Sequence, residues 1–355
     1  MVAVEQSPAL AGAVAPVRAQ LPEWMRAVPP AAWLAAVVLL LLPAFSNSFV
    51  QAQIFGWSFI LGMISLSLMF LAGYGGMVSL VQMSVAGLAG YMVAILGDSA
   101  VATISLGWPW WAVVPVAILV AVIFGTISGA LAVRTAGIYT IMITLAIASA
   151  FFYFTRQNYT IFNGFSGFNA LRAPEFWGVS WRNPMAFYYM SLFFASLSYG
   201  AVLYVARTPF GLALQGIRDN PRRMAALGFD VTAHRVAAYA FAAVMAAIAG
   251  VMLVWLNGQV SPGTAGIGPV IDILVIAVIG GLRHPIGPFV GALIYVVLRT
   301  FALDILTHIG LAGERFNLLV GLGFLAIVLF SPDGIVGLWQ RWRQSQAAPR
   351  GSGGS

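Results

Sequence analysis

The chain has 355 residues, of which 61% are hydrophobic and only 8% are charged. Soluble domains carry about 25% charged residues, so this composition excludes a soluble protein and predicts an integral membrane protein. The chain has no cysteine, which excludes disulfides and thiolate metal sites, and its 17 basic residues are all arginine. Without lysine it can form neither a Walker-type ATP-binding loop nor a Schiff base. The net charge of +7 is explained by the topology of a membrane protein, whose basic loops lie beside anionic lipid headgroups. Outside the apolar runs, the sequence shows no platform of arginine and aromatic residues of the kind that would indicate nucleic-acid binding.

Residues 1–30 are rich in proline and alanine and contain too many polar residues for an ordinary signal peptide. We expect them to form a cytoplasmic tail, and residues 338–355 to form a second tail that ends in a Gly/Ser linker remnant. Between them, residues 31–337 contain long unbroken apolar runs, which predict an all-α polytopic membrane domain rather than a barrel. About ten membrane segments are expected, at roughly 31–49, 52–72, 77–97, 108–133, 137–155, 184–206, 234–257, 269–282, 286–303 and 317–332.

The distribution of arginine predicts the orientation of these segments. Ten crossings that start from a cytoplasmic N-terminus place twelve arginines inside and five outside, as the positive-inside rule requires. Both termini are therefore predicted to be cytoplasmic. The turn between the second and third segments is short, so residues 52–97 form either two full spans or a re-entrant pair.

The largest outer loop, residues 156–183, is rich in aromatic residues. Aromatic side chains near a membrane edge usually form an interfacial belt, and we favour this interpretation over a specific docking site. The aromatic and amide residues concerned are Asn158, Asn163, Phe165, Phe168, Phe176, Trp177 and Trp181.

Two functions of other classes are kept as remote alternatives. The pattern around Ser166 matches the Gly-x-Ser-Gly of rhomboid proteases, with His284 or His308 as partner, but four residues match easily by chance in a glycine-rich chain. An ion-coupled secondary transporter would need paired intramembrane charges and an inverted repeat, and neither is evident. His234, His284 and His308 are scattered, so no metal site is predicted.

A polar stretch at residues 207–230, within a predicted loop of residues 207–233, interrupts the apolar chain. Pro209 and Gly211 are expected to end the preceding span. Asn220 followed by Pro221 predicts a helix start, and Gly228 predicts its end. The result is a short amphipathic helix parallel to the membrane, which either rests on headgroups or docks into a cytoplasmic protein. The candidate coupling residues are Gly211, Ile217, Arg218, Asp219, Asn220, Pro221, Arg222, Arg223, Leu227 and Gly228.

Several motifs in order resemble LivM-type permeases, the membrane subunits of branched-chain amino acid ABC importers, whose family includes urea and sugar permeases. The resemblance covers about residues 50–337. Its pieces are Gly73-Tyr74-Gly75-Gly76-Met77-Val78-Ser79-Leu80, Gly87-Leu88-Ala89-Gly90-Tyr91, Gly137-Ile138-Tyr139 with Thr144-Leu145-Ala146, Asn163-Gly164-Phe165-Ser166-Gly167-Phe168, Thr208-Pro209-Phe210-Gly211 with Ile217-Arg218-Asp219-Asn220, Ser261-Pro262 with Asp272, Ile279-Gly280-Gly281-Leu282 with Gly287-Pro288, and Leu329-Phe330-Ser331-Pro332-Asp333-Gly334.

The resemblance implies a polytopic helical permease of a bacterial inner membrane, without enzymatic activity of its own. Its implied partners are a sister permease in a heterodimer, two cytoplasmic ATPase subunits that hold ATP and Mg, and a periplasmic binding protein. No cofactor is expected on this chain. The implied substrate is a branched-chain or related hydrophobic amino acid, with urea, short amides or another small organic molecule as the alternative.

Three departures from the family pattern affect the substrate rather than the fold. Asp272 replaces a frequent Glu, Val81-Gln82 replaces Gly-His or Gly-Gln, and Arg283-His284 replaces small residues. Asp272 lies in an apolar segment, where an acid costs about 3 kcal/mol or more, so it either lines the path or caps a broken helix. The glycines either pack helices or expose unwound backbone to the path. Candidate path residues are Gly75, Ser79, Gln82, Tyr139, Thr144, Asp272, Gly280 and Gly281.

Overall fold

The computed structural model describes residues 30–101, 103–176, 178–282 and 284–308, and the isolated residues 321, 334, 335 and 337. The chain divides into two units, residues 1–46 and residues 47–355. The described element of the first unit is the helix α2 (Pro30–Phe45). The expected tails and most of the expected segment 317–332 lie outside the described residues, as does Arg283.

Five described helices of the second unit are long and apolar enough to cross a membrane, and three shorter apolar helices accompany them. The first long helix runs from Val50 to Tyr74. Its middle is α3 (Trp57–Met69), and its ends are wound as π-helix (Val50–Gly56 and Phe70–Tyr74). The other long helices are α5 (Trp110–Ala132), α6 (Ile138–Gln157), α8 (Pro184–Arg207) and α11 (Val231–Asn257). The shorter ones are α4 (Gln82–Leu96), α12 (Ile267–Gly280) and the part of α13 (Gly287–His308) up to Phe301.

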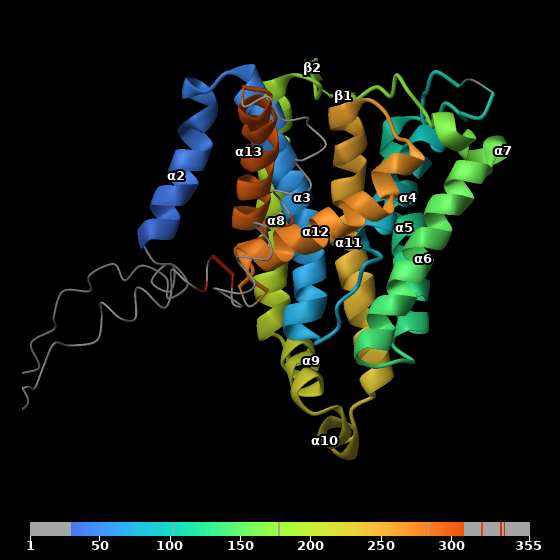
Figure 1. Ribbon diagram of the computed structural model, residues 1–355, viewed down its shortest axis with the longest axis vertical. Coiled ribbons are helices and arrows are strands. Elements are labelled where there is room, and N and C mark those ends of the chain that lie inside the picture. Colours follow the sequence, from blue (N-terminus) through green and yellow to red (C-terminus); the bar gives the residue numbers. More distant parts are fainter. Residues whose placement is uncertain are drawn as a thin grey trace, which may run out of the picture. The chain divides into compact units, whose positions relative to one another are not determined.

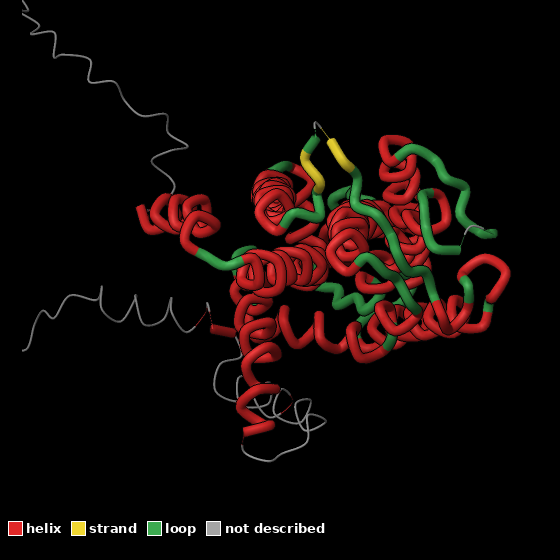
Figure 2. The backbone as a smooth tube through the Cα atoms, turned by 90° about the horizontal axis from the view of Figure 1, so that it is seen from above, coloured by secondary structure: helices red, strands yellow, loops and turns green. Residues whose placement is uncertain are grey.

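These helices make the chain a multi-pass membrane protein, as its composition predicts. The long helices run side by side, whereas α12 lies across them (Figure 1). Within the described residues, strands are confined to the short hairpin of β1 (Glu175–Phe176) and β2 (Val179–Ser180) (Figure 2). The total of ten segments and the cytoplasmic position of both termini remain predictions.

Two breaks interrupt the helical pattern. After Tyr74 the chain continues without regular structure to Val81, and α4 begins only at Gln82. The expected segment 77–97 is therefore a 15-residue helix preceded by irregular chain, whereas the expected segment 52–72 is a full-length helix. The second break separates α12 from α13, where Gly281 adopts a φ of 108° that favours glycine.

Small residues let α11 pack closely against its neighbours. An added Cβ at Gly250 would collide with the backbone of Ala86 on α4, and the Cβ of Ala243 lies against Gly125 on α5. Without a hydrophobic driving force between helices in lipid, such backbone approach is a principal source of packing energy. The helices α11, α4 and α5 therefore form the packed centre of this unit.

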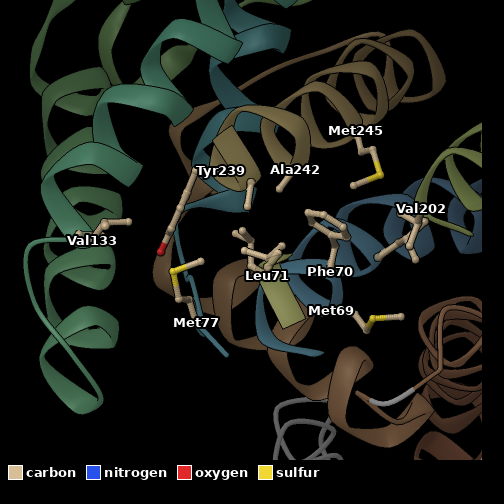
Figure 3. Packing of buried hydrophobic residues seen from close by; sticks show 13 residues of the cluster. Met69, Phe70, Leu71, Met77, Val133, Val202, Tyr239, Ala242 and Met245 are labelled. Carbon is tan, nitrogen blue, oxygen red and sulfur yellow. The ribbon is translucent and has the colours of Figure 1, made fainter. Parts of the chain in front are cut away.

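A core of buried apolar side chains lies near the Tyr74 end of the first long helix (Figure 3). It is built from that helix, the irregular segment after it, and the helices α5, α8 and α11, together with one residue of the connection between α8 and α11. Its members are Leu66, Met69, Phe70, Leu71, Met77, Ala132, Val133, Val202, Leu214, Ala238, Tyr239, Ala242 and Met245.

The outer loop contains the short helices α7 (Tyr159–Phe162) and η3 (Gly164–Ser166). Its aromatic residues do not all form a belt. Phe168 is fully buried, packs edge-on against Tyr91 and exchanges two backbone hydrogen bonds with Val260. Phe165 is 67% exposed, and the Arg156 guanidinium lies over its ring. The belt interpretation is therefore wrong for Phe168, which belongs to the core.

Candidate functional site

The connection between α8 and α11 consists of two helices, α9 (Pro209–Asp219) and α10 (Pro221–Ala226), at the bottom in Figure 1. The preceding span ends just before Pro209, as expected, but the sequence did not predict that a second helix begins there. Arg207 is the last residue of α8, and Pro209 is the first residue of α9, where its fixed φ and missing N–H suit a helix start. The Thr208 hydroxyl accepts a hydrogen bond from the Gly211 backbone N–H and caps the new helix.

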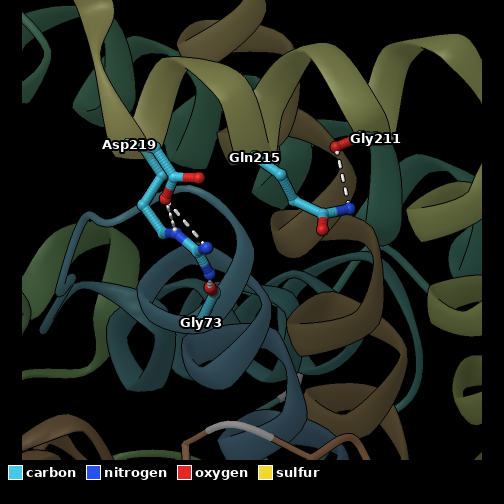
Figure 4. Close-up of polar contacts among 5 residues, drawn as sticks. Gly73, Gly211, Gln215 and Asp219 are labelled. Atoms are coloured by element: carbon cyan, nitrogen blue, oxygen red, sulfur yellow. Dashed lines mark hydrogen bonds and ion pairs between the residues drawn. The ribbon is translucent and has the colours of Figure 1, made fainter.

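One side of α9 is buried in the protein. Gly211, Ala213, Leu214 and Ile217 are its buried residues, and Leu214 and Ile217 are fully inaccessible. Leu214 belongs to the core cluster at the end of the first long helix. The Gln215 side-chain amide also donates to the backbone carbonyl of Ala206 on α8 and to that of Gly211, the second of which is drawn in Figure 4. The helix α9 is therefore fixed to the membrane bundle.

Arg218 links α9 to the first helix break. Its Nη1 donates to the carbonyl oxygen of Gly73 at 2.6 Å, and its Nε and Nη2 contact Asp219 Oδ1 at 2.9 Å (Figure 4). The Gly73 carbonyl is one of the last in its helix and has no intrahelical donor available, so a cation is a favourable partner. Arg218 also packs against Gly76. Among the described residues, Arg218–Asp219 is the one ion pair.

By contrast, α10 projects from the bundle and has no buried residue. The predicted cap is confirmed, because the Asn220 side chain accepts from the Arg223 backbone N–H at 3.0 Å and Pro221 is the first helical residue. The helix ends at Ala226, and Gly228 has the expected left-handed φ of 90°. Arg222, Arg223 and Leu227 are all exposed, and Leu227 is 66% accessible. The coupling candidates thus divide into an anchored set on α9 and an exposed set on α10.

The path candidates Ser79, Gln82 and Thr144 meet at the first break. The Thr144 hydroxyl oxygen accepts from the Leu80 backbone N–H at 3.2 Å, and Gln82 Oε1 accepts from the Ser67 hydroxyl at 3.2 Å. All of these polar side chains are buried. The Gln82 amide nitrogen and the Ser84 hydroxyl have no hydrogen-bond partner among the described residues. Polar groups that are buried without partners are rare in folded proteins, so these two atoms are positions where a water, an ion or a ligand can bind.

The other path candidates lie elsewhere. Tyr139, in the first turn of α6, is 65% exposed and does not join the group at the break. Gly75 is buried at the start of the first break. Gly280 and Gly281 form the second break, where an added Cβ at Gly280 would collide with the carbonyl oxygen of Gly287. The path candidates are thus spread over two breaks and one cavity.

That cavity, of about 540 Å³, contains Asp272. It lies between the first long helix, the start of α4, the end of α11, and the helices α12 and α13. Sequence reasoning missed Asn257, Tyr295 and Arg299, which also line it. Tyr295 and Arg299 are four residues apart on α13, and this spacing places them on one helix face. The full lining is Trp57, Leu61, Met83, Leu253, Asn257, Thr264, Gly268, Pro269, Ile271, Asp272, Val275, Tyr295, Arg299 and Gly321.

Ser166 is exposed on η3, in the loop that follows α6. His284 follows Leu282, whose carbonyl oxygen lies against Gly73 near the other end of the bundle. The structure therefore does not bring Ser166 to His284, and the side chain of His308 lies outside the described residues. No cluster of metal-ligating residues occurs in the described part of the chain.

Comparison with known proteins identifies the family. The family described as the permease component of branched-chain amino acid transport systems matches residues 50–328. The chain belongs to this family. Among its relatives, the high-affinity branched-chain amino acid permease protein LivM of Salmonella typhimurium is 22% identical over 296 residues, covering 77% of this chain and 65% of the relative.

Two further relatives show the range of this permease family. The probable branched-chain amino acid permease protein LivH of Methanocaldococcus jannaschii is 26% identical over 155 residues, or 41% of this chain and 46% of the relative. The ribose import permease protein RbsC of Haemophilus influenzae is 24% identical over 241 residues, or 65% of this chain and 73% of the relative. This permease thus spans about half to two thirds of the length of the first relatives it matches. No solved structure matches it.

Proposed function

We propose that the chain is the membrane-spanning permease subunit of an ATP-driven importer for branched-chain or related hydrophobic amino acids, in a bacterial inner membrane. A sister permease, two ATPase subunits that hold ATP and Mg, and a periplasmic binding protein complete the transporter. The named functions of the relatives support the substrate class. The absence of lysine agrees with an ATPase on another chain, because a Walker-type loop requires it.

The observation that carries this proposal is the exposed, capped helix α10 on an anchored helix α9. A helix that only rests on lipid headgroups does not need a rigid attachment to the bundle, whereas a docking helix has to transmit movement to it. Leu214 and Arg218 attach α9 to the bundle in this way. Arginines also gather at this end, where exposed Arg134 lies in the turn between α5 and α6. By the positive-inside rule, this gathering of arginines supports a cytoplasmic position for this end, where an ATPase would bind.

The ribose permease among the relatives supports a second candidate, a sugar or another small neutral substrate such as urea or a short amide. The cavity near α12 favours an amino acid over these, because its walls carry one acid and one arginine. A neutral sugar requires neither charge.

Charge reversal of both exposed arginines, Arg222→Glu with Arg223→Glu, tests the docking role in the complete transporter. We expect normal membrane insertion and at least about a tenfold loss of ATPase association and leucine uptake, since like-charge contacts at an interface cost several kcal/mol. The matched control is Arg134→Glu, which reverses an exposed arginine at the same end outside α9 and α10. Unchanged coupling in the double variant would refute the docking role. Uptake that follows an ion gradient without any ATPase subunit would refute the ATP-driven mechanism.

A further inference from the structure

The cavity beside α12 has two walls of opposite charge. Asp272 reaches it from the second turn of α12, and Arg299 reaches it from α13. Both side chains line the same cavity, yet no ion pair of 4.0 Å or less joins them. The Tyr295 hydroxyl lies beside the Asp272 carboxyl. Arg299 is near enough to interact electrostatically with Asp272, but without a direct ion pair both groups can still contact a ligand group of opposite sign.

The location of these charges requires an explanation. Both lie on apolar helices of a membrane bundle, where an ionised side chain is costly unless it faces a cavity or a partner. An acid and an arginine kept only for stability would be expected to pair with each other. Here the two groups line one cavity without an ion pair of 4.0 Å or less, which is an arrangement expected when a ligand carries the two complementary charges.

The rest of the lining is mainly apolar. Leu61, Leu253, Ile271 and Val275 supply aliphatic surface, and Trp57 adds an aromatic face. Asn257 and Thr264 add neutral polar groups. Binding sites for small molecules are typically cavities of about 300–1,000 Å³ with apolar walls and a few placed polar groups. The volume of about 540 Å³ lies within this range.

We propose that this cavity is a transit site for a zwitterionic α-amino acid, with Asp272 binding the ammonium, Arg299 binding the carboxylate, and the aliphatic wall receiving an apolar side chain. This assignment rests on the proposed function and names the site of its substrate. Met83, at the cavity wall, directly follows Gln82, so the site adjoins the polar group at the first break. A bound amino acid would thus lie next to the chain segment that interrupts the membrane helices.

A second cavity, of about 370 Å³, offers an internal control. It also carries one acid and one arginine, Asp98 and Arg172, but lies at the loop between α4 and α5, with Trp108 and Trp110 in its lining. It does not adjoin either helix break. A probe that merely seeks opposite charges would label both cavities equally.

The test is photolabelling of the full chain in lipid nanodiscs with photo-leucine, an α-amino acid whose branched side chain carries a diazirine, followed by peptide mapping. We expect label on peptides that contain Trp57, Leu61 or Ile271. Excess L-leucine should remove it. Equal concentrations of isopentylamine or 4-methylpentanoate, which lack one of the two charges, should not.

Asp272→Asn and Arg299→Gln should each reduce the label at least about tenfold, because each leaves one ligand charge without its partner. Asp272→Glu and Arg299→Lys keep the charges and should retain more label, which separates binding from misfolding. The double control Asp98→Asn with Arg172→Gln should leave the label unchanged. Label that maps to the second cavity, or that survives both Asp272→Asn and Arg299→Gln, would overturn the proposal.

Leucine uptake by the complete transporter is measured in parallel. Uptake without cavity label overturns the transit site and leaves the proposed function standing. Cavity label without uptake by the assembled, ATP-hydrolysing transporter supports the site as an amino acid site and overturns the proposed import function.

Discussion

Replacement of Arg218 by alanine should detach α9 from the first helix break. The bond from Arg218 Nη1 to the Gly73 carbonyl is 2.6 Å long and charge-assisted. Hydrogen bonds to charged groups contribute about 1.5–3 kcal/mol. The Arg218 side chain is 41% exposed, so solvent screening reduces this to about 1–2 kcal/mol. That free energy corresponds to a change of about 5–30-fold in the population of detached α9.

Hydrogen exchange measures this change directly. The backbone N–H groups of Gly75, Gly76 and Met77 donate to Leu71 and Ala72 at the end of the first long helix. Loosening of that end should therefore raise the exchange rates of these three amides by about 5–30-fold in the Arg218→Ala variant. Coupled transport, measured as leucine imported per ATP hydrolysed in proteoliposomes, should fall in the same variant while the ATPase still binds to α10.

Asp219→Ala is the matched control. It removes the partner of an exposed ion pair but leaves the bond from Arg218 to Gly73, and such exposed pairs contribute about 0–1 kcal/mol. Exchange and coupling in this variant should stay close to the wild-type values. If Arg218→Ala leaves both the protection of Gly75–Met77 and the coupling ratio unchanged, the link through Gly73 has no mechanical role.

Two further predictions concern the cap of α10 and the second break. Asn220→Ala removes the side-chain acceptor of the Arg223 N–H and should destabilise α10 by about 0.5–2 kcal/mol, seen as faster exchange in that helix, whereas the cap-forming Asn220→Asp should not. Gly280→Ala forces a Cβ into the Gly287 carbonyl and should lower the thermal stability of the purified protein markedly, since overpacking costs about 1–3 kcal/mol or more. Its control is Gly200→Ala on α8, where an added Cβ meets no described atom within 4 Å and stability should be unchanged.

Local chemistry in the sequence predicted the cap of α10 and the φ of Gly228, because both depend on residues next to each other in the chain. The end of the preceding span at Pro209 is as expected, but the start of α9 at the same proline was not predicted, because proline is compatible with both the end of one helix and the start of the next. Thr208, a good cap that directly precedes this proline, is the local signal for the helix start. The sequence predicted one short helix in this connection, whereas the structure has two, α9 and α10.

Other features depend on packing and left no local signal. The apolar character of residues 77–97 predicts burial, but burial does not distinguish a helix from irregular chain whose backbone is satisfied by the protein around it. The contact between Arg218 and Gly73 joins residues 145 positions apart. The juxtaposition of Asp272 and Arg299 likewise depends on how α12 and α13 meet. In both cases the residues can be read from the sequence, but only the structure shows which of them lie together.

The two helix breaks converge on one residue of the first long helix. The Gly73 carbonyl binds Arg218 of α9, and the Leu282 carbonyl oxygen lies against the same glycine where an added Cβ would collide with it. Because both contacts meet at Gly73, we expect a shift of α9 that moves this helix end to move the loop between α12 and α13 as well. The loop joins α12 and α13, the two helices that carry Asp272 and Arg299 into the cavity. A force applied at α10 would thereby reach the helices that form one side of the cavity.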